Sequence, residues 1–153
     1  MRRLAEIENI IGVKEASGSI AQITQVIQQA PQGFIVLSGD DSLTLPVVAM
    51  GGRGIVSVVS NEIPAEMTRL AQLCVAGDFA GARVLQRKYQ PLMEINFVET
   101  SPGPVKAAMA EMGLLEPVWR LPLVAPKPEN LAKIRAVLES LALLERVHVA
   151  NRA

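Results

Sequence analysis

Histidine, cysteine and aromatic residues are scarce: the 153 residues include one histidine, one cysteine and five aromatic side chains. A single cysteine, Cys74, cannot form an internal disulfide, so we expect a buried free thiol in a reducing compartment. The lone histidine, His148, lies near the end of the chain, and neither a zinc site nor a catalytic triad can be assembled around it. These shortages exclude a scaffold held by internal disulfides and a zinc site or catalytic triad built around histidine.

The sequence also lacks a charge excess and a long apolar run. Lysine plus arginine and aspartate plus glutamate each number 15, and the two signs are interspersed. This balance argues against a nucleic-acid partner and against an electrostatic membrane anchor. No apolar run approaches bilayer length, and the basic start is followed by residues too acidic for a signal peptide. We therefore expect a soluble, cytoplasmic protein.

Half of the residues are apolar, which is enough for a sizeable core, and the first part of the chain repeats a strand–loop–helix pattern. After the tail of a helix at residues 1–8, strands are predicted at 10–14, 34–37 and 54–59, with helices at 20–30, at 42–50 and from Pro64 to about residue 76. Strands that are apolar throughout favour a parallel sheet covered on both faces. Three strands cannot close a barrel, so one face and two edges would stay uncovered, and the sequence looks like part of something larger.

After Gly77 the pattern becomes helical. Predicted helices cover 79–96, 105–112 and 129–145, a proline-punctuated segment at 114–128 runs extended, and 148–153 form a frayed tail. The predicted fold class is α/β. It consists of a partial barrel of three parallel strand–helix units at 1–76 and a carboxyl-terminal helical extension at 77–153.

The first strand ends on Lys14, an unusual residue for a buried strand because burying an ammonium group is costly. Desolvation favours the neutral amine, which is the nucleophile that forms an imine with a carbonyl compound. The alternative is a lysine with a buried stem and a solvated head. Ligands bind at the carboxyl ends of parallel strands, where Gly39 permits close approach. Peptide groups around Gly39 and Val56 could hold a small carboxylate or keto oxygen there.

Other polar groups have simpler interpretations. Asp40 and Asp41 could hold a divalent metal, but without further ligands nearby a helix cap is favoured. The glycines at 51–54 follow a helix and precede a strand, the reverse of a phosphate-binding loop. Lys106 is expected to be solvated or ion-paired. No metal and no cofactor are predicted.

Several motifs occur in an order typical of one enzyme family: Gly-Val-Lys-Glu-Ala-Ser-Gly at 12–18, Leu-Ser-Gly-Asp-Asp at 37–41, Gly-Ile-Val-Ser-Val at 54–58, Phe-Val-Glu at 97–99 with Pro-Val-Lys at 104–106, and Arg-Leu-Pro-Leu at 120–123. Together they resemble the carboxyl-terminal half of the dihydrodipicolinate synthases, members of the pyruvate-dependent Schiff-base aldolases that include N-acetylneuraminate lyase. Thr-Ser-Pro-Gly at 100–103 departs from the family's Asn-Pro-Ile, in the helical extension rather than at the imine site.

The resemblance implies a (β/α)8 barrel with a helical extension, usually a homotetramer. Lys14 would match the lysine that forms an imine with pyruvate, Val56 the pyruvate-contacting position on the last strand, and Gly39 a residue lining the same pocket. The resulting enamine would attack a small aldehyde, L-aspartate 4-semialdehyde, on the lysine and diaminopimelate pathway.

In this family the amino-terminal half supplies a threonine pair, the proton-relaying tyrosines and the arginine that binds the semialdehyde. The only tyrosine here, Tyr89, is expected to pack within the extension. General acid–base help is worth about 10²–10⁴-fold, so the chain alone should be a very poor synthase. Three hypotheses stay open: a synthase half that works in a homo-oligomer or with a complementing amino-terminal half, a non-catalytic remnant or assembly subunit, and a neuraminate or keto-sugar-acid lyase.

Overall fold

The computed structural model describes residues 2–144, and the chain divides into two compact units. The amino-terminal unit comprises Met1–Ser57 and Ala65–Arg87, and the carboxyl-terminal unit comprises Val58–Pro64 and Lys88–Ala153. Each unit therefore combines two separate stretches of the sequence. The division into domains 1–76 and 77–153 stays a prediction.

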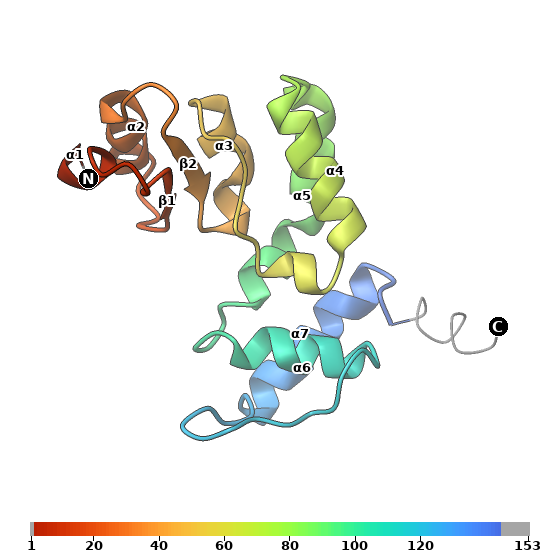
Figure 1. Cartoon of the computed structure of the whole chain (residues 1–153). Coiled ribbons are helices and arrows are strands. Elements are labelled where there is room, and N and C mark those ends of the chain that lie inside the picture. Colours follow the sequence, from red (N-terminus) through yellow and green to blue (C-terminus); the bar gives the residue numbers. More distant parts are fainter. Residues whose placement is uncertain (1, 145–153) are drawn as a thin grey trace. The chain divides into compact units, whose positions relative to one another are not determined.

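Two short parallel strands form the sheet of the amino-terminal unit (Figure 1). Strand β1 (Gly12–Glu15) pairs with β2 (Ile35–Ser38) in a register that places Lys14 opposite Leu37. Both strands lie where the apolar runs predict them, with shifts of one or two residues at their ends. A backbone hydrogen bond of 2.7 Å from Gly39 N to Glu15 O continues the pairing past the end of β2.

The third predicted strand, 54–59, is wrong in its extent. This segment forms one isolated parallel bridge, between Ser38 and Ile55, on the side of β2 away from β1. Its last backbone hydrogen bond to β2 runs from Val56 N to Ser38 O (2.8 Å), and a 3-10 helix, η2, begins at Val59. A strand lengthens when neighbours pair with it on both edges, and the described residues place no strand on this segment's outer edge.

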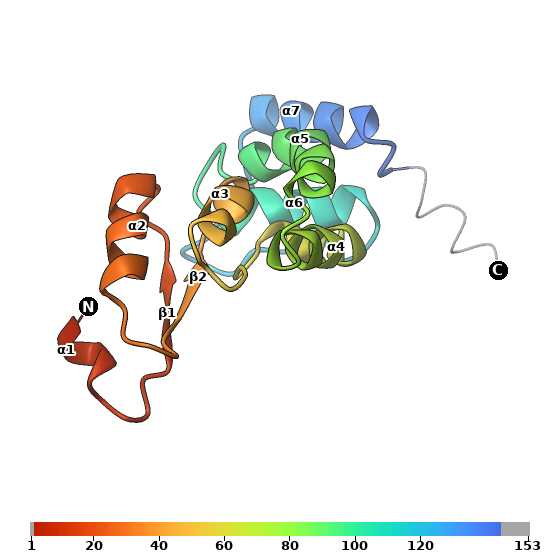
Figure 2. The same cartoon turned by 90° about the horizontal axis from the view of Figure 1, so that it is seen from above.

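Helices account for most of the remaining elements (Figures 1 and 2). They are α1 (Arg2–Ala5), α2 (Ile20–Gln29), η1 (Asp41–Leu43), α3 (Thr44–Ala49), η2 (Val59–Asn61), α4 (Pro64–Val75), α5 (Phe79–Ile95), α6 (Gly103–Glu111) and α7 (Pro128–Ser140). The predicted helices at 20–30, 79–96 and 105–112 are confirmed, and the segment between α6 and α7 has no regular structure, as its prolines indicate.

Two predicted helices differ in their limits. The helix expected at 42–50 is divided into η1 and α3. The last helix, expected at 129–145, ends at Ser140, and both Glu145 and the predicted tail at 148–153 lie outside the described residues.

The two faces of the sheet differ in what covers them. Val36 and Ser38 are buried, and the Gln22 side chain of α2 donates a 3.0 Å hydrogen bond to the Glu15 carboxylate on the same face. Paired residues of parallel strands share a face and neighbours along a strand alternate. Lys14 and Leu37 therefore lie on the opposite face, called here the open face.

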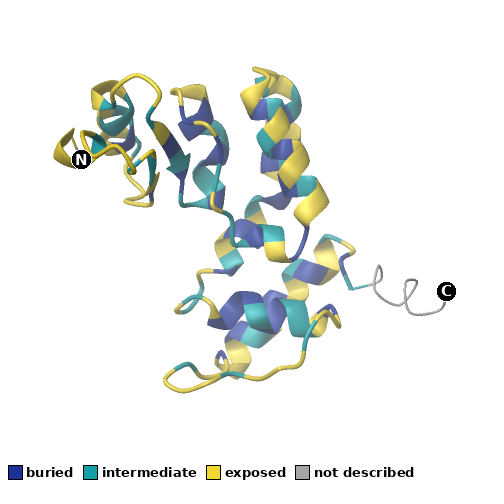
Figure 3. Ribbon diagram, in the orientation of Figure 1, coloured by how far each residue is buried: buried dark blue, intermediate teal, exposed yellow. Residues whose placement is uncertain are grey.

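Each unit has its own core (Figure 3). In the amino-terminal unit, Met67, Leu70 and Cys74 of α4 are buried, as their helical spacing predicts. In the carboxyl-terminal unit, α6 packs on α7, and Tyr89 is only 2% exposed, which confirms that it packs within the extension. Within residues 2–144, no helix is both long and apolar enough to cross a membrane.

Candidate active site

Lys14 lies near the carboxyl end of β1 on the open face, where its side chain is exposed. Between residues 2 and 144, no carboxylate forms an ion pair with the Lys14 amine. The expectation that this amine is held out of water is therefore wrong for the chain as described. The reason is geometrical: helices cover the opposite face of the sheet, and no described element covers this one.

Gly39 follows β2 and lies against the Lys14 side chain. A Cβ atom at position 39 would lie 2.8 Å from Lys14 Cε, 2.6 Å from Ala16 Cβ and 3.1 Å from Glu15 O. Real Cβ atoms essentially never approach other heavy atoms closer than 3.0 Å. The absence of a side chain at position 39 thus leaves space for the lysine stem.

Val56 belongs to the third segment and also faces the open side. Ile55 is bridged to Ser38 on the helix-covered face, so its neighbour Val56 shares the opposite face with Leu37. Val56 is 43% exposed. The structure therefore places all three sequence-predicted site residues on one face of one sheet.

An open hollow of about 440 Å³ lies beside Lys14 on the amino-terminal unit, and neither Gly39 nor Val56 is among its lining residues. It is lined by Asn9, Ile10, Ile11, Gly12, Val13, Lys14, Ile35 and Leu37. Lys14 is the only ionisable residue of this lining. A primary amine in a mostly apolar lining, in which Asn9 is the other polar side chain, suits imine formation with a small carbonyl compound.

The loop between β1 and α2 is fixed directly after Lys14. The Glu15 carboxylate is 9% exposed, accepts 3.3 Å hydrogen bonds from Ser17 N and also binds Gln22 Nε2. Ser19 caps α2 by accepting a hydrogen bond from Gln22 N. The Glu15 side chain points to the helix-covered face, where it fixes the loop. The Lys14 amine lies on the opposite, open face.

A second polar cluster follows β2, and sequence reasoning missed its central contact. Ser57 Oγ donates a 2.5 Å hydrogen bond to Asp41 Oδ1, and Asp41 is only 1% exposed. The sequence features that could have indicated it are Ser57, next to Val56, and Asp41, which directly follows the capping Asp40. Asp40 itself caps η1 by accepting a 2.9 Å hydrogen bond from Ser42 N, so the predicted helix cap is confirmed.

Comparison with known proteins assigns the chain to a protein family. The family described as the Dihydrodipicolinate synthetase family matches residues 1–141. The chain belongs to this family. The 4-hydroxy-tetrahydrodipicolinate synthase of Koribacter versatilis is 50% identical over 149 residues, which cover 97% of this chain and 50% of that protein.

Solved structures of the dihydrodipicolinate synthetase family match the fold. The synthase from Aquifex aeolicus superposes with a TM-score of 0.90 at 41% identity, covering 94% of this chain and 49% of its own. A chloride-inhibited synthase from Acinetobacter baumannii, solved in complex with pyruvate, gives a TM-score of 0.89 at 34% identity, covering 93% and 49%. The chain thus spans about half the length of the family members that it matches, with the same α/β fold over that half.

The remaining candidates offer less chemistry than Lys14. In the part of the chain that the structure describes, no three histidine, cysteine or acidic residues gather as a metal site would need. Burial raises the pKa of the Cys74 thiol, which keeps it protonated and unreactive. Lys106, expected to be solvated or ion-paired, donates a 2.5 Å hydrogen bond to the Val118 carbonyl at an exposed position and ties α6 to the extended segment.

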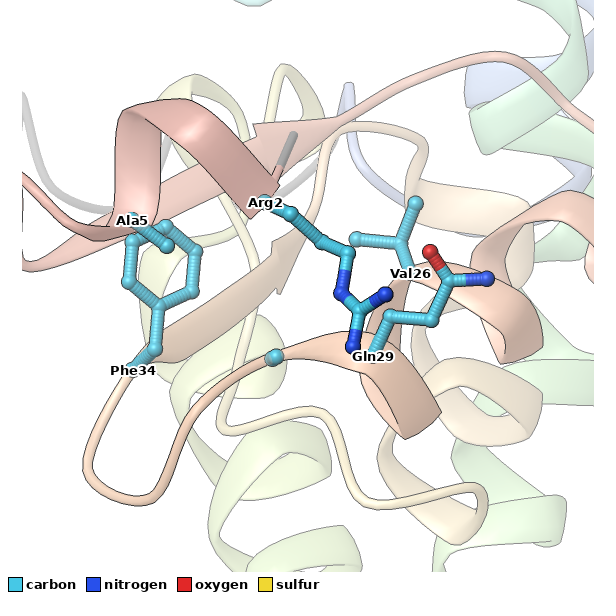
Figure 4. A pocket seen from close by; sticks show the side chains of 6 residues that line it. Arg2, Ala5, Val26, Gln29 and Phe34 are labelled. Atoms are coloured by element: carbon cyan, nitrogen blue, oxygen red, sulfur yellow. The ribbon is translucent and has the colours of Figure 1, made fainter.

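A small pocket between α1, α2 and Phe34 is also unsuited to catalysis (Figure 4). Its volume is about 10 Å³, room for at most about one water molecule. Arg2 is the only ionisable residue among those that line it: Arg2, Ala5, Val26, Gln29, Ala30 and Phe34. This pocket is a packing gap within the amino-terminal unit.

Proposed function

We propose that this chain supplies the imine-forming half of the active site of a dihydrodipicolinate synthase-type lyase built on a (β/α)8 barrel. The reaction condenses pyruvate with L-aspartate 4-semialdehyde. The observation that carries the proposal is the meeting of Lys14, Gly39 and Val56 on one uncovered sheet face. The family membership and the pyruvate complex of the Acinetobacter baumannii relative support it.

Lys14 is the nucleophile of the proposed mechanism. Its neutral amine attacks the keto carbon of pyruvate, and loss of water leaves a carbon–nitrogen double bond. The protonated imine acts as an electron sink, so a proton leaves the methyl carbon and an enamine forms. That carbon attacks the aldehyde of the semialdehyde, and cyclisation of the adduct returns the lysine amine.

The open face determines how far this chain takes the reaction by itself. No described element shields Lys14 from water, whereas a cover over the open face would exclude water from the imine-forming amine. The proton relay and the semialdehyde-binding arginine implied by the family resemblance belong to the other half. We expect slow imine formation by this chain and condensation only when a complementing amino-terminal half is supplied.

A second candidate is a non-catalytic assembly subunit. It is favoured by large apolar side chains exposed on the open face, among them Ile35 (36%) and Val56 (43%). Such a chain would bind another half-barrel without turnover. The keto-sugar-acid lyase has no observation in its favour, because the relatives at 43–50% identity are named as synthases. Homo-oligomeric assembly and a cytoplasmic location stay predictions.

Trapping the imine tests the proposal. The chain is incubated with pyruvate and sodium borohydride, which reduces the imine to a stable secondary amine, and the modified lysine is located by peptide mass spectrometry. Lys14→Arg should abolish the label, whereas Lys133→Arg should not, because Lys133 donates its hydrogen bond to Asn130 in the carboxyl-terminal unit. The proposal fails if the label maps to other lysines, or if none forms even with the amino-terminal half of the Koribacter versatilis synthase present.

Turnover separates the two candidates. A mixture of this chain with that amino-terminal half should consume both substrates in a reductase-coupled assay, and Lys14→Arg should abolish this activity. Association without turnover, seen as a concentration-dependent mass in light scattering, would favour the assembly subunit.

A further inference from the structure

The buried aspartate behind the open face belongs to a network that joins three parts of the amino-terminal unit. The Asp41 side chain accepts from Ser57 Oγ, and its backbone carbonyl accepts a 2.8 Å hydrogen bond from Thr44 Oγ1 at the start of α3. Gln86 Nε2 of α5 donates to the Ser42 carbonyl at 3.1 Å. The bonds from Thr44 and Gln86 go to backbone carbonyls of the loop after β2, whereas only the Asp41 side chain reaches the third segment in these contacts.

The third segment depends on this carboxylate because its sheet pairing is short. Its backbone hydrogen bonds to β2 end at Val56 N, and η2 begins three residues later. Ser57 is the next residue, and its bond to Asp41 is the first attachment beyond the sheet. A hydrogen bond to a carboxylate is stronger than one between neutral groups. The hydrogen bond between Ser57 and Asp41 therefore fixes the backbone next to Val56, whose side chain lies on the open face.

We propose that Asp41 and Ser57 are positioning residues: their hydrogen bond holds Val56 in place beside Lys14 and Gly39, so that the keto-acid subsite is complete. This inference rests on the proposed function, since the subsite is the one in which Lys14 forms its imine. Neither residue lies on the open face, and both act through Val56. The consequence is that the bond sets how tightly pyruvate is held, rather than how fast the bound amine reacts.

Three substitutions test the bond. Ser57→Ala removes the hydroxyl, and Ser57→Thr keeps it. Thr44→Val is the matched control, because Thr44 is fully buried and its hydroxyl bonds the same aspartate at the backbone carbonyl, away from the third segment. Any effect of general destabilisation should appear in Thr44→Val as well.

The first readout is the pyruvate concentration that gives half-maximal borohydride trapping on Lys14. We expect Ser57→Ala to raise it about tenfold, the weight of roughly one hydrogen bond to a charged group, with little change in the maximal trapping rate. Ser57→Thr should restore it to near the unmodified value. Thr44→Val should lower the melting temperature without moving the half-saturation point.

The second readout needs no ligand and is exchange of the Val56 amide hydrogen, which is bonded to Ser38 O. We expect Ser57→Ala to accelerate this exchange about tenfold or more relative to Thr44→Val. Equal exchange in those two variants would overturn the inference, whether or not Lys14 is labelled. An unchanged half-saturation point in Ser57→Ala would overturn it too, whereas absence of label in the unmodified chain would overturn the proposed function.

Discussion

Gly39 and Lys14 lie so close together that position 39 has no room for a side chain. A Cβ there would lie 2.8 Å from Lys14 Cε and 2.6 Å from Ala16 Cβ. The lysine stem is flexible and can move, whereas the Ala16 Cβ is fixed to the backbone. A residue larger than glycine would therefore displace the amine and strain the loop after β1.

Gly39→Ala tests this relationship. We expect a loss of about 1–3 kcal/mol in the free energy of unfolding, the usual cost of overpacking, measured by urea denaturation. Trapping of pyruvate on Lys14 should fall roughly tenfold or more, because the amine is displaced. Gly103→Ala is the control, since its nearest neighbour would be 3.7 Å away. Unchanged trapping in Gly39→Ala would show that the lysine position does not depend on Gly39.

Asp40 can be tested for two alternative roles, a helix cap or a metal ligand. Its carboxylate accepts hydrogen bonds from Ser42 N (2.9 Å) and Ser42 Oγ (2.8 Å). We expect Asp40→Ala to cost about 1 kcal/mol in the free energy of unfolding and Asp40→Asn to cost much less, because asparagine also caps helices. Calcium or magnesium should leave the melting temperature unchanged. A metal-dependent rise in the unmodified chain that disappears in Asp40→Ala would contradict the cap.

The Glu99 carboxylate gives the carboxyl-terminal unit a pH dependence. Hydrogen bonds from the Asn130 side chain and from Lys127 N, both 2.8 Å, lower the pKa of Glu99 from its ordinary value of 4.5. Because the unfolded chain then binds the proton more readily, this contribution is present above about pH 4.5 and is lost as the pH falls through the native pKa. Protonation should loosen the start of α7.

Glu99→Gln removes that titration. The melting temperature of the unmodified chain should exceed that of Glu99→Gln at about pH 6, and the difference should shrink by about pH 3. Glu139→Gln is the control, because Glu139 pairs with Arg135 on the surface of α7, away from its start. A difference that is constant or grows on acidification would show that the Glu99 hydrogen bonds do not act as described.

The sequence predicts the elements around Lys14 well because their signals are local. The apolar run and its parallel partner specify β1 and β2, and α2 begins at Ile20, where the predicted helix at 20–30 begins. The third segment does not form the predicted six-residue strand. The length of a strand depends on its pairing partners, and the local sequence pattern carries no information about a partner along the outer edge. The same tertiary dependence explains why Lys14 is exposed although it sits at the end of an apolar strand.

The candidate site likewise combines features that the sequence predicts with features that depend on tertiary structure. The family resemblance names Lys14, Gly39 and Val56, whereas the register that places Lys14 and Val56 on a common face comes from the strand pairing in the structure. The bond between Asp41 and Ser57 spans 16 residues and depends on how the loop after β2 folds back. Sequence spacing does not predict such a contact, so only the three-dimensional structure reveals it.

The most direct test of the central claim is the distribution of reduced pyruvate adduct over the five lysines of the chain: Lys14, Lys88, Lys106, Lys127 and Lys133. Quantitative peptide mapping after borohydride trapping, with limiting pyruvate, measures it in a single experiment. The account predicts that Lys14 carries nearly all of the adduct and that an excess of a competing small keto acid removes it. An adduct spread evenly over the five lysines would contradict the assignment of Lys14 as the imine-forming residue.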